Sequence, residues 1–272
     1  MSKSQIKNFF KDEFFLKIWP RLGGKKISWA LFESQTPINK ATMLWNSLTP
    51  SINLLFKKIS LPLRNDPNET DENYFKRVTS KIYEKNLKLD SIHQKFSIWP
   101  SVALETGGAN CSLSSQAQGL FLQKLGYKVE FGLPGPMSHA VIFVEDRERD
   151  KYYLDPANGT MCKVVGEEEI EGIKTYLIKP EDERIPFRRV PVCSLEESIA
   201  TTIWNLASLK QDAVNNVESA SLVKRFGVER DIPYGDWTLD NLLPTWRKLK
   251  QHPVWEQEER ESSERIRLTK LR

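Results

Sequence analysis

Three residue types that can perform acyl chemistry follow one another in a short part of the chain. Cys111 stands directly after "TGGAN", His139 begins the run "HAVIFVE", and Asp155 ends the run "KYYLD". Thiol-dependent acyl transfer requires a thiolate nucleophile, an imidazole that moves protons and a group that orients the imidazole. The set therefore predicts a catalytic triad, with Cys111 as nucleophile, His139 as general base and Asp155 as orienting acid.

The position of Cys111 favours a reactive thiol. A helix that begins at this residue presents unpaired backbone N–H groups and a partial positive charge to the sulfur, and both favour the thiolate. Asn110 is a candidate donor to an oxyanion, although an Asn that only shapes a turn is an equally good interpretation. Trp99 is a candidate wall of the cleft, although a core position explains a Trp more simply. Each residue alone also has an ordinary structural explanation, so the prediction depends on the complete set.

Hydrophobic periodicity predicts the helices that must position these residues. The first 96 residues have helical spacing, with a stretch that is interrupted or kinked at Pro50 and a later helix capped by Thr70 or Asp71. The segment 111–125 predicts a helix with one buried apolar stripe. That stripe consists of Leu113, Ala117, Leu120, Phe121 and Leu125.

Short runs rich in β-branched and aromatic residues follow this helix. The runs "YKVEFGL", "SHAVIFVED", "KYYLDP", "CKVVG" and "KTYLI" predict an antiparallel sheet. The polar turn "DRERD" joins two of these strands, which puts His139 and Asp155 at the same end of the sheet and predicts a hydrogen bond between them. Helical spacing resumes at Ser194, and a further helix is expected at about 212–225 before a charged tail.

The order of the predicted elements is that of an α+β protein, since helices and strands are segregated along the chain and do not alternate. We expect an N-terminal helical extension over residues 1–70, a catalytic core over 71–193 and a C-terminal helical extension over 194–272.

The block "GGANCSLSSQAQGLFLQKLGYKVEFG … SHAVIFVE … YYLDPANG" resembles the core of the transglutaminase-like superfamily. The resemblance covers about residues 72–160 and implies a papain-like Cys-His-Asp fold, in which the nucleophile helix packs on an antiparallel sheet. It also implies the roles proposed above for Cys111, His139 and Asp155. Asn110 and Ser112 stand where transglutaminases proper carry Gln and Trp, so the resemblance implies the triad class and no particular substrate.

Composition limits the classes of partner that we expect. The chain carries a formal charge of +4, and residues 1–100 hold 17 Lys and Arg against 9 Asp and Glu. These basic residues are scattered along amphipathic segments, which indicates solvated helix faces, so a nucleic-acid partner is not expected. No apolar run is long enough to span a bilayer and no secretory signal is recognisable, so we expect no membrane partner and a cytoplasmic location.

Three widely spaced cysteines without a C-x-x-C pair predict neither a disulfide framework nor a metal site, and no cofactor is expected. Cys162 and Cys193 lie in strand-like runs, where we expect inert core residues.

The sequence therefore predicts an enzyme, a cysteine hydrolase or acyltransferase that acts on an amide or ester. Its substrate would be a peptide, a protein or a small molecule, and its reaction peptide or isopeptide hydrolysis, deamidation or acyl transfer to an amine. The alternative is a non-catalytic binding or scaffold protein that retains the transglutaminase-like fold. Hydrolysis and transfer share the nucleophile, so the choice between them stays open, as does the oligomeric state.

Overall fold

The computed structural model describes residues 14–64, 66–86, 97, 99–134, 139–179, 185, 188–203, 205, 255 and 260. The helix expected at about 212–225 and the charged tail after residue 260 lie outside the described residues. The chain divides into two compact units, each described here by itself. Unit 1 comprises Met1–Ser60, Lys85–Leu113 and Glu196–Pro244, and unit 2 comprises Leu61–Glu84, Ser114–Leu195 and Thr245–Arg272. The division into three consecutive segments stays a prediction.

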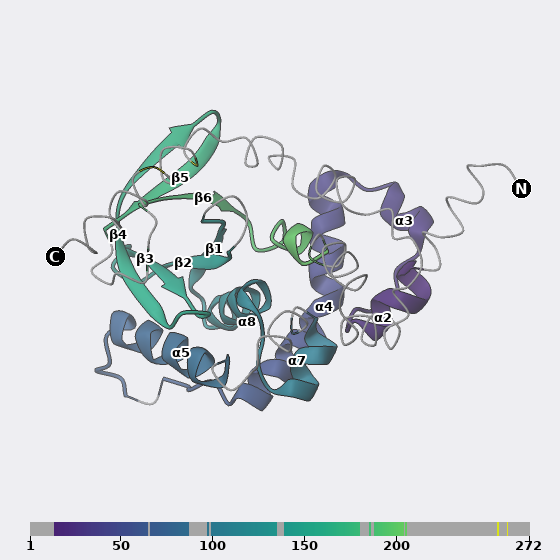
Figure 1. Cartoon of the computed structure of the whole chain (residues 1–272), viewed down its shortest axis with the longest axis horizontal. Helices are drawn as coiled ribbons and strands as arrows, with labels where there is room; N and C mark the ends of the chain where they lie inside the picture. The colour runs from purple at the N-terminus through teal and green to yellow at the C-terminus, as the bar shows by residue number, and fades with distance from the viewer. Residues whose placement is uncertain are drawn as a thin grey trace, which may run out of the picture. The chain divides into compact units, whose positions relative to one another are not determined.

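Unit 1 is helical in its described part. Its elements are a π-helix, η1 (Phe14–Ile18), and the helices α2 (Trp19–Arg21), α3 (Trp29–Glu33), α4 (Pro37–Ile59) and α7 (Pro100–Thr106) (Figure 1). Aromatic side chains fill its core, and the ring of Phe15 lies 5.7 Å from that of Trp29 and 4.8 Å from that of Phe32. Stacked and tilted rings of this kind add to the stability that burial alone supplies.

The long helix α4 has recognisable ends. Thr36 Oγ1 accepts a hydrogen bond from the backbone N–H of Asn39 at 3.4 Å, and Pro37 occupies the first turn, where its missing N–H costs nothing. Ser60 ends the helix in the left-handed conformation, with φ of 56°. The helix continues through Pro50, so of the two outcomes predicted there the interruption does not occur.

The helices α5 (Asp71–Asn86) and α8 (Cys111–Lys124) belong largely to unit 2. The Thr70 side chain accepts from Asn73 N at 3.2 Å and so caps α5, as one of the two predicted caps. Phe75 of α5 packs its ring edge against the rings of Tyr127 at 4.9 Å and Tyr152 at 5.9 Å. This contact fastens α5 to the strands of unit 2.

The strands of unit 2 form a closed antiparallel barrel in the order β1 to β6 (Figure 1). Their bounds are β1 (Lys128–Gly132), β2 (Val141–Glu145), β3 (Lys151–Asp155), β4 (Thr160–Ile170), β5 (Ile173–Ile178) and β6 (Arg189–Cys193). The five predicted runs are all strands. The strand β6 was not predicted, and it closes the barrel because it pairs with both β5 and β1.

The predicted papain-like core, a nucleophile helix packed on an antiparallel sheet, is therefore wrong for this chain. The sheet is a closed six-stranded barrel, because β6 returns to β1 through the pairs Phe131↔Cys193 and Gly132↔Val192. Closure pairs the backbone groups that an open sheet leaves at its two edges. This strand was not predicted because Pro191 lies inside it, and a proline argues against a strand that pairs on both sides.

The helix α8 is buried on nearly all of its surface. Leu113, Ala117, Leu120 and Phe121 are buried as predicted, whereas Leu125 is 42% exposed and lies beyond the end of the helix. Polar side chains are buried as well: Ser112, Ser114, Ser115, Gln116 and Gln118. The Gln118 amide donates to Thr79 Oγ1 at 2.7 Å, which offsets part of the cost of burial. One buried apolar stripe was expected, and burial extends to nearly every side of the helix.

In the part of the chain that the structure describes, no helix is long and apolar enough to cross a membrane.

Candidate active site

His139 and Asp155 meet at one end of the barrel. His139 precedes the first residue of β2 by two positions, and Asp155 is the last residue of β3. The antiparallel register Ile142↔Leu154 brings the start of β2 beside the end of β3. His139 Nε2 lies 2.8 Å from Asp155 Oδ2, so the expected hydrogen bond is present.

The Asp155 carboxylate, 1% exposed, is held by a complete set of donors. Its Oδ1 accepts from the backbone N–H groups of Ala157 and Asn158, each at 3.1 Å. Its Oδ2 accepts from Asn158 Nδ2 at 2.9 Å and faces His139 Nε2. These bonds satisfy both oxygens of a buried charge that would otherwise be costly. The carboxylate is therefore fixed in position and can fix the imidazole in turn.

This geometry selects a tautomer of His139. Because both oxygens of an ionised carboxylate only accept hydrogen bonds, the ring donates from Nε2–H. A neutral imidazole protonated on Nε2 carries its lone pair on Nδ1, which is then the atom able to take a proton. Asp155 thus has the contacts of an orienting acid.

The turn after β3 brings Asn158 to the Asp155 carboxylate, and this turn requires a glycine at position 159. Gly159 has φ of +67°, and an added Cβ would lie 2.6 Å from Cδ1 of the Tyr83 ring. A side chain at this position meets both backbone strain and a steric clash. The contact between Asn158 and Asp155 was not predicted from the sequence. The spacing of three residues between them in a turn is the signal that could have found it.

Tyr153 lies two residues before Asp155 on the same face of β3. Burial, followed by the charge of Asp155, raises the pKa of Tyr153 well above its usual value. Tyr153 is therefore a neutral phenol beside the carboxylate and is not a competing base.

A second contact holds the backbone next to His139. Ser115 Oγ of α8 donates to the carbonyl oxygen of Ala140 at 2.9 Å, and both residues are fully buried. Ala140 follows His139 directly, so the bond restrains the segment that carries the imidazole. Sequence reasoning missed Ser115 as well, and the available signal was its spacing of four residues from Cys111, which puts both on one helix face.

Cys111 is the first residue of α8, as predicted, and its side chain is half-buried. Asn110 caps the helix, since its Oδ1 accepts from Leu113 N at 3.0 Å. This bond occupies the side-chain oxygen, so Nδ2 is the part of Asn110 that could donate to an oxyanion. Cys111 and Asn110 belong to unit 1, whereas His139 and Asp155 belong to unit 2. Cooperation of Cys111 with the other two residues stays a prediction.

The other candidates are buried. Trp99 is 2% exposed, and its ring packs edge-on against Trp19 at 6.3 Å. This is the packing of a core side chain, and a role in a cleft stays a prediction. Cys162 in β4 and Cys193 in β6 are buried core residues, as expected.

No family model, curated protein or solved structure matches this chain. Among the described residues, no group of three or more His, Cys, Asp or Glu side chains is arranged to hold a metal ion.

Proposed function

We propose that the protein is a cysteine hydrolase or acyltransferase that acts on an amide or ester through Cys111, His139 and Asp155. The observation that carries the proposal is the hydrogen bond of 2.8 Å between His139 and a buried carboxylate that has donors on both oxygens. An imidazole held in this way is oriented and keeps one tautomer, which general base catalysis requires. A buried ionised carboxylate without such a partner would be a cost to the fold.

In the proposed reaction Cys111 gives its proton to His139 Nδ1, and the thiolate attacks the carbonyl carbon. A C–S bond forms, and the bond from that carbon to the amine or alcohol breaks as His139 protonates the leaving group. Water then attacks the thioester with His139 as base and releases an acid and the free thiol. An amine in place of water gives a new amide, which is the transferase outcome.

The start of α8 supports the choice of Cys111 as nucleophile. Backbone N–H groups in a first helical turn lack intrahelical acceptors and favour a nearby anion. The backbone N–H of Cys111 and Nδ2 of Asn110 are the proposed donors to the oxyanion, where each donor is worth about 10²–10³ in rate in known examples. Ser115 lies one turn along α8 from Cys111, and its hydroxyl donates to the carbonyl oxygen of Ala140, the residue after His139. This hydrogen bond restrains the position of the helix.

The order of Cys, His and Asp along the chain resembles that of transglutaminase-like enzymes, and on that ground we propose that this protein uses the same type of chemistry. Only the residues support this proposal, because the closed barrel differs from the core that the resemblance implied.

An acyl-trapping experiment tests the proposal. The protein is mixed with p-nitrophenyl acetate, p-nitrophenol release is followed, and acetylated protein is located by mass spectrometry of its peptides. We expect a burst of p-nitrophenol and an acetyl group on Cys111. Both should be lost in Cys111→Ala, with thermal unfolding unchanged, and in His139→Ala, where loss of one donor to Asp155 also lowers stability by about 1–2 kcal/mol. Faster loss of the acetyl group on adding an amine would indicate transfer, and loss in water alone would indicate hydrolysis.

Selective alkylation gives an independent test of the partnership. Cys162 and Cys193 are buried, so preference of iodoacetamide for Cys111 follows from exposure alone and decides nothing. The informative comparison is the rate at Cys111 in wild type and in His139→Ala. We expect a slower rate in His139→Ala. Equal rates in the two proteins, together with a full biological role for Cys111→Ala, would favour the scaffold alternative.

A further inference from the structure

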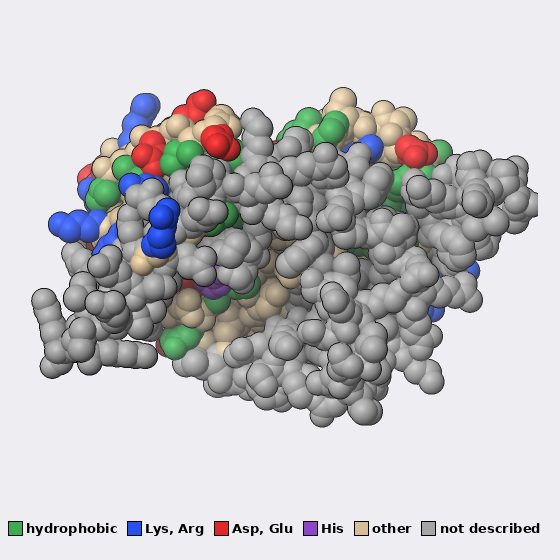
Figure 2. All heavy atoms as spheres, turned by 45° about the horizontal axis from the view of Figure 1, so that its top comes forward, with side chains coloured by type: hydrophobic (Ala, Val, Ile, Leu, Met, Phe, Trp, Pro, Cys, Tyr) green, Lys and Arg blue, Asp and Glu red, His purple; other side chains and the backbone are tan. Residues whose placement is uncertain are grey.

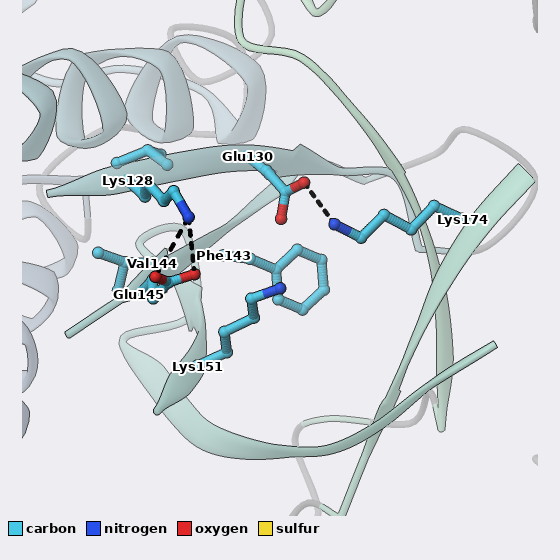
Figure 3. A pocket seen from close by; sticks show the side chains of 8 residues that line it. Lys128, Glu130, Phe143, Val144, Glu145, Lys151 and Lys174 are labelled. Atoms are coloured by element: carbon cyan, nitrogen blue, oxygen red, sulfur yellow. Dashed lines mark hydrogen bonds and ion pairs between the residues drawn. The ribbon is translucent and has the colours of Figure 1, made fainter. Parts of the chain in front are cut away.

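A cavity of about 240 Å³ lies in the barrel (Figure 3). Strand register puts it at the end away from His139 and Asp155. Its lining combines three lysines, two glutamates and three apolar residues: Lys128, Lys151, Lys174, Glu130, Glu145, Val129, Phe143 and Val144. Nothing in the proposed acyl chemistry uses these residues. The cavity is therefore separate from the residues of the proposed acyl chemistry.

Strand register puts the charged side chains of this cavity on the inner face of the barrel. Glu130 pairs with Phe143, a member of the barrel core, and alternation along β1 puts Lys128 on the same face. Lys151 pairs with Glu145 at the end of the β2–β3 ladder opposite to Asp155. These residues therefore form one mouth of the barrel. Mouths of barrels are among the preferred places for small ligands.

The two carboxylates of the cavity already have partners. Glu130 Oε1 accepts from Lys174 Nζ at 2.7 Å, and Glu130 Oε2 accepts from the Tyr176 hydroxyl. Glu145 lies 3.3 Å from Lys128 Nζ on the opposite side (Figure 3). Burial opposes ionisation of Glu130, but the bonds from Lys174 and Tyr176 prevail and lower its pKa. Glu130 thus acts as an anion whose charge the protein itself neutralises.

The lysines keep capacity to donate. Lys151 extends toward the two ion pairs (Figure 3), and its Nζ lies 4.5 Å from the centre of the Tyr176 ring. Its Nζ donates to the Tyr176 hydroxyl at 2.5 Å and lies 3.6 Å from Glu167 Oε2. An ammonium group carries three donors, and its side chain is 26% exposed, so it is open to a further acceptor. Lys and Arg side chains also gather on the surface of the barrel unit, with acidic side chains beside them (Figure 2).

We propose that this mouth of the barrel binds a small organic anion. Its carboxylate lies against the Lys151 ammonium with Lys128 or Lys174 beside it, and its apolar part lies toward the apolar residues of the lining. Glu167, 3.6 Å from Lys151 and 3.8 Å from Lys174, balances the third lysine, so the site is favoured for an anion by the open donor of Lys151 and not by a net charge. A cation would have to displace Lys174 or Lys128 from its glutamate. A volume of about 240 Å³ equals that of about eight waters, at roughly 30 Å³ each, which suits a single small molecule.

Benzoate is the probe that tests this site, since it joins a carboxylate to a flat apolar ring. Binding to the full chain is measured by titration calorimetry and by ligand-observed NMR. Benzylamine has the same ring with the opposite charge, and inorganic phosphate is an anion without a ring. We expect saturable benzoate binding in the millimolar range and weaker binding of both other probes.

Two variants assign the binding to the cavity. Lys151→Met keeps the length of the side chain and removes its charge, and we expect benzoate affinity to fall about tenfold or more, as for loss of a charge-assisted hydrogen bond. Lys174→Met should weaken binding too and serves if Lys151→Met unfolds. Lys163→Met is the matched control, because Lys163 lies on β4, pairs with Asp150 and does not line the cavity.

The proposal fails if benzoate shows no saturable binding, or if its affinity is the same in wild type, Lys151→Met and Lys174→Met. Tighter binding of benzylamine would overturn the choice of an anion. Phosphate that binds as tightly as benzoate would overturn the assignment of an organic ligand. Acetylation of Cys111 by p-nitrophenyl acetate is read separately, so failure of one site leaves the other testable.

Discussion

Replacing Asp155 by Asn separates the structural role of this carboxylate from its effect on the imidazole. In the wild type Oδ1 accepts from the backbone N–H groups of Ala157 and Asn158. Oδ2 accepts from His139 Nε2 and Asn158 Nδ2. An amide has one oxygen and one NH2 group, so one of these donor pairs must face another donor. Which pair does so decides what the substitution costs.

The backbone donors cannot adapt to an NH2 group. If they faced it, two buried N–H groups would lack acceptors, at about 1–3 kcal/mol each. The side-chain donors can adapt, because His139 can move its proton to Nδ1 and Asn158 can rotate its amide to offer oxygen. The cost is then the difference between a charged and a neutral acceptor, about 1 kcal/mol. We therefore expect the NH2 group to face His139 and the melting temperature to fall by about 2–4 °C.

The same rearrangement removes the lone pair from Nδ1, the position at which His139 is proposed to take the proton of Cys111. We expect acetylation of Cys111 to fall steeply, since losses of about 10⁴-fold are known when a triad imidazole is held in the wrong tautomer. Nitrogen NMR of labelled histidine reports the tautomer, and thermal unfolding reports the stability. Asp146→Asn is the matched control, because that side chain also accepts two backbone N–H groups in unit 2 but contacts no imidazole.

Two results would refute this reasoning. The first is an Asp155→Asn protein that keeps the Nε2–H tautomer and full acetylation of Cys111. The second is a loss of stability above about 3 kcal/mol, which would mean that the amide nitrogen faces the backbone donors after all.

Three further predictions concern the surroundings of this carboxylate and the N-terminus of α5. Asn158→Ala should lower stability by about 1–2 kcal/mol without changing the His139 tautomer, because only one of four donors is lost; urea unfolding and NMR measure the two effects. Gly159→Ala should cost more than about 1–2 kcal/mol, since backbone strain adds to the clash with Tyr83, and a cost near zero would contradict the described turn. Although burial opposes it, hydrogen bonds from Tyr127, Arg147 N and Arg64 lower the pKa of Asp71. The contribution of Asp71 to the free energy of unfolding is thus present above the unfolded pKa of about 3.9 and is lost as the pH falls through the folded value. In Asp71→Asn the free energy of unfolding should therefore depend less on pH in the acid range.

Local signals were sufficient for the part of the site that lies within one hairpin. Runs rich in β-branched and aromatic residues predicted β2 and β3, and the polar turn between them fixed which residues lie at the same end. The hydrogen bond between His139 and Asp155 follows from that register. The start of α8 at Cys111 was equally predictable, because the capping residue Asn110 and the apolar spacing lie within a few positions of it.

The sequence by itself thus determined the helices α4, α5 and α8, five of the strands and the pairing of His139 with Asp155, all of which depend on neighbours along the chain. Only the tertiary structure decided the closed barrel, because β6 must cross from β5 to β1, and a strand that contains Pro191 shows no local pattern for it. Closure in turn brings Lys174 of β5 to Glu130 of β1, 44 residues apart, and so creates the charged mouth. Contacts between residues so distant in sequence leave no periodic trace, since they depend on how strands meet in space and not on the order of side chains within a strand.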